Sequence, residues 1–254
     1  LAAILLLISA CSSEKETKPQ ETQAPTLFKR VAAAQSGVSF SNEITETEVK
    51  NIITYEYFYH GGGVAAGDFN NDGLPDLYFT GNQVANKLYL NKGDFQFEDI
   101  TEKSGTKGSG AWANGVTLVD INSDGFLDIY VCNSGWKVKP EACRNELYVN
   151  NGDLTFTEKA AAYGLDDASF STQAVFFDMD QDNDLDLFLV NRPERPYRTK
   201  EAYQLKRTRI QGASDKLFRN DNGKYVDISA TSGIIQNGLG YGLGVAVGDI
   251  NKDG

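Results

Sequence analysis

The feature that most constrains this chain is a repeated unit that begins with an Asp-rich loop. Each copy has a run of small or β-branched residues, then the loop, then an alternating apolar stretch with strand character. In the complete copies, an apolar segment ending in Asn follows, and then a segment ending in Gly. Self-similarity of this kind indicates a repeat architecture rather than an ordinary globular domain. The four copies begin at Gly63, Gly115, Ala174 and Gly244.

The spacing of these landmarks shows where the repeat is constrained. From the Asn landmark of one unit to the first loop Asp of the next is 29, 28 and 29 residues. From each first loop Asp to the Asn landmark of its own unit is 23, 30 and 42 residues. The length variation therefore falls in one connection of each unit, at residues 133–144 and 192–213. Extensions of a single connection gather on one face of a repeat protein, which is often its binding face.

Four short strands in each unit predict an all-β fold, a β-propeller of four-stranded blades. In the first unit the strands are expected in GVAAGDF, DLYFTG, KLYLN and FEDIT. Residues 28–37 are similar to the Gly-ending landmark, so the folded part is expected to begin on the last strand of a blade. We expect residues 27–254 to form an incomplete propeller of about three blades and the start of a fourth. No segment has a helical period with caps, so no helix is predicted.

The Asp-rich loops place oxygen atoms at fixed offsets. Asp or Asn stands at positions 1, 3, 5 and 9, and Gly or Asn stands at position 6, where the backbone must turn sharply. Position 7 offers a backbone carbonyl, and Ca²⁺ takes about six to eight oxygen ligands of these kinds. We therefore predict several structural Ca²⁺ sites. Their ligands are Asp68, Asn70, Asp72, Leu74 and Asp76 in the first loop, Asp120, Asn122, Asp124, Phe126 and Asp128 in the second, Asp178, Asp180, Asp182, Asp184 and Asp186 in the third, and Asp249, Asn251 and Asp253 in the fourth.

Two other interpretations fit these loops less well. An EF-hand needs a bidentate Glu at position 12, where the chain has Phe79, Val131 and Leu189. Asp and Asn are also common in turns that bind no ion. Several carboxylates in one loop repel one another without a counter-ion, and offsets kept in every copy favour Ca²⁺. The third loop has five Asp, and we expect it to bind most tightly.

The segments GVAVGDINKDG and GVAAGDFNNDGLPDLYFTGN resemble FG-GAP, or VCBS, repeats, which occur in integrin α-subunit propellers and in many bacterial surface proteins. Together with LYLNKG and FEDIT, they are most similar to bacterial relatives of cartilage acidic protein. The resemblance covers about residues 27–254. It implies calcium between the first two strands of a blade and a ligand-binding face at the opposite end. The chain departs from the family pattern at Asn183, which stands where Gly is usual, and in lacking the Phe-Gly pair in the first and third repeats.

The N-terminal residues indicate export. Residues 1–10 are LAAILLLISA, an apolar run too short to span a bilayer, and they resemble the remnant of a signal peptide. Cys11 follows where a bacterial lipobox has its lipidated cysteine. Residues 11–26 are otherwise polar and without periodicity, as expected of a disordered tether. These features predict an outer-membrane lipoprotein at the cell surface, attached to the membrane by its lipid anchor only.

Two further features leave alternatives open. Cys132 and Cys143 fit either a disulfide across a short loop or two thiols. Residues 192–219, the longer extension and its flank, carry nine Lys and Arg in a chain whose formal net charge is −11. This basic segment fits either the recognition of an acidic ligand or an ordinary solvated loop.

Composition and motifs argue against two classes of function. An acidic chain lacks the clustered Lys and Arg that general nucleic-acid binding needs, so no nucleic acid is expected as a partner. The lone histidine, His60, and the lack of a G-x-S-x-G motif give no support for an enzyme. We expect a non-enzymatic calcium-binding module that recognises an extracellular protein or glycan. The alternative is a non-catalytic propeller in a larger exported enzyme or polysaccharide-processing system.

Overall fold

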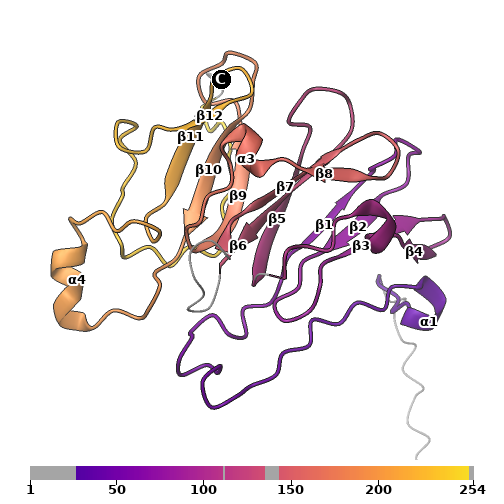
Figure 1. Cartoon of the computed structure of the whole chain (residues 1–254), viewed down its shortest axis with the longest axis horizontal. Coiled ribbons are helices and arrows are strands. Elements are labelled where there is room, and N and C mark those ends of the chain that lie inside the picture. The colour runs from indigo at the N-terminus through magenta and orange to yellow at the C-terminus, as the bar shows by residue number, and fades with distance from the viewer. Residues whose placement is uncertain (1–26, 111, 135–142, 252–254) are drawn as a thin grey trace, which may run out of the picture. The chain divides into compact units, whose positions relative to one another are not determined.

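A computed structural model of the protein describes residues 27–110, 112–134 and 143–251. The chain divides into two compact units, Leu1–Val31 and Ala32–Gly254, and the second contains every described helix and strand. In this second unit, three four-stranded antiparallel sheets follow one another along the chain (Figure 1). The strands of each sheet lie in chain order, so each sheet is a simple meander. The predicted all-β architecture of propeller blades is confirmed, and the described residues do not close a ring.

The three sheets have matching strand order and matching register. The innermost strand of each sheet contains the run of small or β-branched residues, and the outermost strand begins the segment that ends in Gly. The first sheet comprises β1 (Val64–Gly67), β2 (Asp76–Phe79), β3 (Lys87–Asn91) and β4 (Phe97–Asp99). The second comprises β5 (Ala113–Val119), β6 (Asp128–Asn133), β7 (Glu146–Asn150) and β8 (Phe156–Glu158). The third comprises β9 (Ser171–Phe177), β10 (Asp186–Asn191), β11 (Lys216–Asn220) and β12 (Tyr225–Asp227).

The first strands of neighbouring sheets lie close together, with β5 beside both β1 and β9. Glycine at the start of a repeat permits this approach. A Cβ atom on Gly63 would lie 2.8 Å from the carbonyl oxygen of Asn114, and one on Gly115 would lie 2.4 Å from that of Thr172. Both distances are shorter than a side chain allows, so only Gly fits at these two positions.

The core lies between the sheets, in two clusters of buried side chains. The first core cluster joins sheets one and two and includes Tyr78, Leu88 and Tyr148. The second core cluster joins sheets two and three and includes Leu147 and Leu187. Strand β6 supplies both clusters in alternation, because successive side chains of a strand point to opposite faces. Ile129 and Val131 enter the first cluster, and Tyr130 and Cys132 enter the second.

Three one-turn helices, each ending in a left-handed Gly, pack beside the sheets: α1 (Ala33–Ser36), α2 (Thr101–Ser104) and α3 (Ala160–Tyr163). A Cβ atom on Gly37, after α1, would lie 2.3 Å from the carbonyl oxygen of Phe97, where β4 begins. Gly105, after α2, faces the first residue of β8 in the same way, and Gly164, after α3, faces the first residue of β12. Their added Cβ atoms would lie 3.7 and 2.8 Å from the carbonyl oxygens of those residues. Helix α1 therefore packs beside the first sheet in the way that α2 packs beside the second sheet. This agrees with the similarity of residues 28–37 to the Gly-ending landmark.

Two local expectations differ from the structure. Residues 28–31 form no strand, since a blade's last strand needs a neighbouring strand with which to pair. The prediction of no helix is wrong, both for the one-turn helices α1, α2 and α3 and for the longer extension, where α4 (Thr199–Leu205) forms. The seven residues of α4 are too few to show a helical period. The start of the helix is stabilised by Glu201, whose carboxylate accepts the Arg198 N–H at 3.2 Å. Among the described residues, no helix combines the length and the apolar character needed to cross a bilayer.

Candidate metal centres

The three complete Asp-rich loops connect the first and second strands of their sheets. Position 6 has the left-handed backbone that the sequence predicts, with φ of 83° at Gly73, 87° at Gly125 and 70° at Asn183. Asn is one of the few residues with a side chain that accept this conformation readily. The departure from Gly in the third loop therefore keeps the turn.

A second left-handed residue at position 4 was missed by the sequence analysis. It is Asn71, Ser123 and Gln181 in the three loops, with φ of 59°, 57° and 63°. Ser and Gln carry no signal for this conformation, and only Asn71 could have suggested it. The two left-handed residues give all three loops the same tight coil.

The coil closes around the carboxylate at position 1. In the first loop, Asp68 Oδ1 accepts the N–H of Asp72 at 3.1 Å and Oδ2 accepts the N–H of Gly73 at 2.6 Å. The corresponding distances are 3.0 and 2.9 Å in the second loop and 3.2 and 3.0 Å in the third. Backbone donors thus hold the first predicted ligand of the three complete loops in one orientation.

Positions 3 and 5 divide the loops into two types. In the first loop the amide of Asn70 donates to Asp72 Oδ2 at 3.0 Å, and in the second Asn122 donates to Asp124 at 2.8 Å. Position 3 of the third loop is Asp180, which has no amide to donate. There the carboxylate oxygens of Asp178, Asp180 and Asp186 lie within 4.8 Å of one another, the one such acidic cluster found among the described residues.

Charge repulsion is concentrated in the third loop. Burial, with repulsion from the carboxylates of Asp182, Asp186 and Asp178, raises the pKa of Asp180. Burial and the neighbouring Asp182 also raise the pKa of Asp184, whose Oδ1 is buried and accepts no hydrogen bond. A divalent cation would relieve this repulsion, and oxygen-rich clusters of this kind suit Ca²⁺.

Position 9 has a structural role that the sequence analysis missed. Asp76 is fully buried, its Oδ2 accepts the N–H of Phe69 at 2.9 Å, and its Oδ1 accepts the N–H of Asn91 at 2.7 Å. The amide of Asn91 in turn donates to the carbonyl of Pro75 at 2.8 Å. This arrangement, the Asp–Asn clamp, ties the loop to the third strand of its sheet. The recurrence of Asn at the end of each third strand was its signal.

The Asp–Asn clamp recurs in the other two sheets. Asp128 accepts the N–H groups of Ile121 and Asn150 at 2.9 and 2.7 Å, and burial raises its pKa to about 6. Asp186 accepts those of Met179 and Asn220, both at 2.8 Å. Both Asp side chains are fully buried. Because position 9 already holds two backbone N–H groups, a cation there would share the carboxylate with the clamp.

The remaining predicted ligands are placed as follows. Position 7, held by Leu74, Phe126 and Asp184, lies between the left-handed turn and the second strand. Asp249 and Asn251 of the fourth loop lie in an irregular segment. Asp253, Cys11 and the rest of the N-terminal tether lie outside the described residues. Cys132 and Cys143 are both buried, and a disulfide between them stays a prediction.

The extended connections, residues 133–144 and 192–213, both follow the second strand of a sheet. In an antiparallel meander this places them at the opposite end of the strands from the Asp-rich loops. Much of the basic segment is already engaged there. Arg195 pairs with Glu201 at 3.1 Å. Arg192 is 1% exposed, with its guanidinium 4.6 Å from the ring centre of Tyr55. This engagement reduces the charge available for an acidic ligand.

Comparison with known proteins finds the same repeat. Residues 68–131 match the FG-GAP-like repeat family. The chain is 30% identical to cartilage acidic protein 1 of Xenopus tropicalis over 198 residues, which is 77% of the chain and 28% of that protein. Its identity to human cartilage acidic protein 1 is 26% over 200 residues, 77% of the chain and 27% of that protein. It is 33% identical to integrin alpha-8 of Gallus gallus over 130 residues, 45% of the chain and 12% of that protein. The chain therefore spans little more than a quarter of the cartilage acidic proteins.

Proposed function

We propose that this chain, which carries an FG-GAP-like repeat domain homologous to cartilage acidic protein and integrin α, is a calcium-stiffened recognition module. It acts without catalysis. The Asp-rich loops bind Ca²⁺, and the opposite end of the blades binds an extracellular protein or glycan through the extended connections. The single observation that carries the proposal is the repetition of one loop geometry in three successive sheets.

The calcium part of the proposal is supported by the oxygen atoms that the loops gather. The backbone orients the carboxylate at position 1 in all three loops, and the third loop brings three carboxylates within 4.8 Å of one another. These residues fit a hard cation that takes carboxylate and carbonyl oxygens. When bound, Ca²⁺ would neutralise the loop carboxylates and hold the first two strands together. Through the Asp–Asn clamp, the same ion would restrain the third strand.

Calorimetry and thermal unfolding test this part. Ca²⁺ titrated into the chelator-treated chain should give binding heat, and the melting temperature should rise with Ca²⁺ concentration, because a ligand of the folded state stabilises it. Mg²⁺ should be a weaker stabiliser, since it keeps its water and demands near-octahedral geometry. Equal melting temperatures in Ca²⁺ and in chelator, with no binding heat, would refute calcium binding.

Export and lipid anchoring at Cys11 are proposed on the sequence alone. The apolar residues 1–10, the Cys after them and the polar tether support a bacterial lipoprotein facing outward from the outer membrane. Metabolic labelling with an alkyne fatty acid tests this assignment in a host with the lipoprotein pathway. The wild-type chain should be labelled and Cys11→Ser should not. Equal labelling of both would exclude Cys11 as the attachment site.

The proposed recognition through the extended connections is supported by the position of the length variation between repeats. The fixed parts of the repeat build the blades, and both extensions begin at the end of a second strand that is opposite the predicted calcium loops. Helix α4 presents Tyr203 there with 81% of its surface exposed. Exchanging the segment 194–208 for a short Gly-Ser linker should abolish ligand capture and leave calcium stabilisation intact. Retained capture would place the recognition surface elsewhere.

A further inference from the structure

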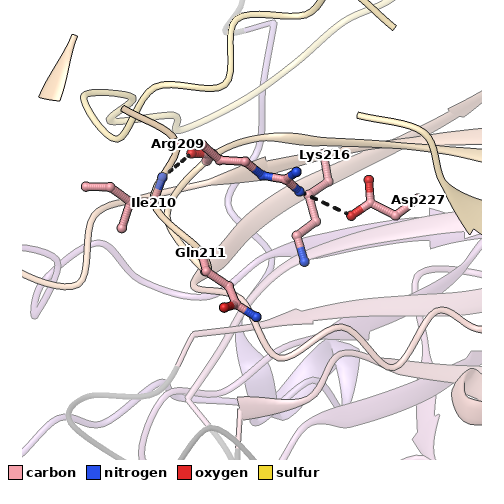
Figure 2. A pocket seen from close by; sticks show the side chains of 7 residues that line it. Arg209, Ile210, Gln211, Lys216 and Asp227 are labelled. Atoms are coloured by element: carbon pink, nitrogen blue, oxygen red, sulfur yellow. Dashed lines mark hydrogen bonds and ion pairs between the residues drawn. The ribbon is translucent and has the colours of Figure 1, made fainter. Parts of the chain in front are cut away.

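The third sheet has a polar pocket of about 410 Å³ at its extended-connection end (Figure 2). One wall is the end of the long extension, residues 209–212, and the other is formed by the strands β11 and β12. Figure 2 shows Arg209 reaching across the pocket to Asp227, with the side chains of Gln211 and Lys216 nearby. Its full lining is Arg209, Ile210, Gln211, Gly212, Ser214, Lys216 and Asp227.

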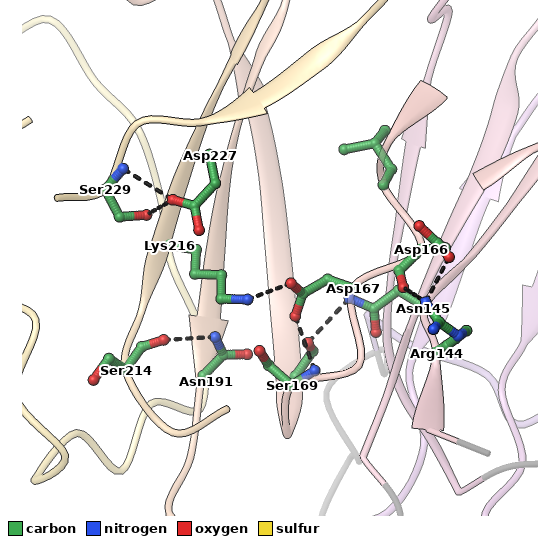
Figure 3. A network of polar contacts seen from close by, with 12 residues as sticks. Arg144, Asn145, Asp166, Asp167, Ser169, Asn191, Ser214, Lys216, Asp227 and Ser229 are labelled. Carbon is green, nitrogen blue, oxygen red and sulfur yellow. Dashed lines mark hydrogen bonds and ion pairs between the residues drawn. The ribbon is translucent and has the colours of Figure 1, made fainter. Parts of the chain in front are cut away.

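At this pocket the third sheet pairs its charges differently from the first sheet. In the first sheet, Lys87 at the start of β3 pairs with Asp99 at the end of β4, at 2.8 Å. Lys216 and Asp227 have the same places in the third sheet and the same strand register. They do not pair with each other. Lys216 instead pairs with Asp167, as Figure 3 shows.

The altered pairing leaves one carboxylate oxygen facing the pocket. Asp227 Oδ1 accepts the Ser229 N–H at 3.0 Å, as Asp99 Oδ1 accepts that of Thr101. Asp227 Oδ2 has Arg209 as its ion-pair partner, at the longer distance of 3.5 Å. A pair at this distance with side chains 46% and 34% exposed is weak, so both groups can make further hydrogen bonds.

The lining determines the kind of ligand. It offers donors from Arg209 and Lys216, an acceptor from Asp227, and both from the exposed amide of Gln211. The positive charges of Arg209 and Lys216 each lie beside a carboxylate, so the pocket has little net charge. This disfavours both a simple anion and a simple cation as the ligand. There is no aromatic side chain in the lining, but the half-buried Ile210 can contact C–H groups. The planar side chains of Arg209, Gln211 and Asp227 offer hydrogen-bond donors and acceptors side by side, and such groups can bind pairs of adjacent hydroxyl groups on a ligand.

We propose that this pocket binds one unit of a neutral saccharide, with Arg209, Gln211 and Asp227 contacting its hydroxyl groups. The volume lies within the range of about 300–1,000 Å³ typical of small-molecule sites. The inference rests on the proposed recognition function and specifies its ligand class. Residues 209–212 belong to the extension that the first sheet lacks, so the first sheet has no equivalent of this wall.

Saturation-transfer difference NMR on the calcium-loaded chain tests the proposal. The probes are glucose, galactose, mannose and N-acetylglucosamine, each at about 10 mM, since a few hydrogen bonds to a small ligand give millimolar affinity. Glucuronate serves as the charged probe. We expect saturation transfer from the protein to at least one neutral sugar. Transfer to none of them, or to glucuronate alone, would overturn the neutral-saccharide assignment.

Three variants locate the binding. Gln211→Ala removes an exposed amide, and Asp227→Asn keeps the acceptor for Ser229 while changing the oxygen that faces the pocket. Each should weaken sugar binding about tenfold, the effect of losing one good hydrogen bond. The matched control is Arg207→Gln, on the same connection but outside the lining, with a change of less than about twofold. Unchanged binding in Gln211→Ala and Asp227→Asn would refute the site.

Thermal unfolding of the same samples separates two failures. If calcium stabilises the chain and no neutral sugar binds, the pocket assignment is refuted and the calcium part of the proposed function stands. If calcium does not stabilise the chain, that part of the proposed function fails, whatever the sugars show.

Discussion

The Asp–Asn clamp and the predicted calcium ligands can be separated by mutating two Asp residues of one loop. Asp128 is fully buried, and it holds the N–H groups of Ile121 and Asn150, which are themselves in buried residues. Asp124 is exposed, with Oδ1 accepting the N–H of Phe126 at 2.9 Å. Position 9 should therefore matter for folding even without calcium, and position 5 should matter mainly for calcium.

The expected magnitudes follow from the groups left without partners. Asp128→Ala leaves two buried N–H groups unsatisfied, at about 1–3 kcal/mol each, so it should lower the free energy of unfolding by about 2–6 kcal/mol. Asp128→Asn can satisfy one of the two N–H groups with its carbonyl oxygen, and it should cost about half as much. Asp124→Ala in chelator should cost less than about 1 kcal/mol, as expected of an exposed site.

Urea unfolding followed by circular dichroism measures these differences, first in chelator and then in saturating Ca²⁺. In chelator the order of loss should be Asp128→Ala, then Asp128→Asn, then Asp124→Ala. Addition of Ca²⁺ should stabilise Asp124→Ala less than the wild-type chain, because the second loop has lost a ligand. Equal losses for Asp128→Ala and Asp124→Ala in chelator would refute the clamp.

Three further predictions concern single positions. Asp180→Asn should lower the calcium affinity of the third loop about tenfold by calorimetry, because it removes one carboxylate from the cluster. Gly115→Ala should lower the free energy of unfolding by about 1–3 kcal/mol, since its Cβ would meet the backbone of Thr172. At Asn183, substitution by Val should cost about 1–2 kcal/mol in thermal unfolding and substitution by Gly almost nothing, because φ is 70°. Equal stability of the Val and Gly variants would contradict the left-handed turn.

Much of the fold could be predicted because its determinants are local and repeated. The Asp-rich turn and the alternating strand after it recur with fixed offsets, and the left-handed position 6 follows from Gly or Asn. Position 4 could not be predicted, since Ser123 and Gln181 have no preference for the conformation that the coil imposes on them. Helix α4 was missed because one short segment held by Glu201 has too few residues to show periodicity.

Contacts between sheets could not be predicted from the sequence. Lys87 and Lys216 occupy equivalent places, and each has an Asp at the equivalent place of the next strand. One Lys pairs within its sheet, and the other pairs with Asp167 in the segment that connects the second and third sheets. The partner depends on which residue of the neighbouring segment comes near, and a repeat alignment contains no such information.

The alternation of β6 between the two core clusters has a consequence for how the blades unfold. Ile129 and Val131 pack toward the first sheet, while Tyr130 and Cys132 pack toward the third, all with no exposed surface. Neither neighbour can detach without uncovering one side of this strand. The three sheets should therefore open as one cooperative unit, and the amides of β6 should be among the last to exchange with solvent deuterium.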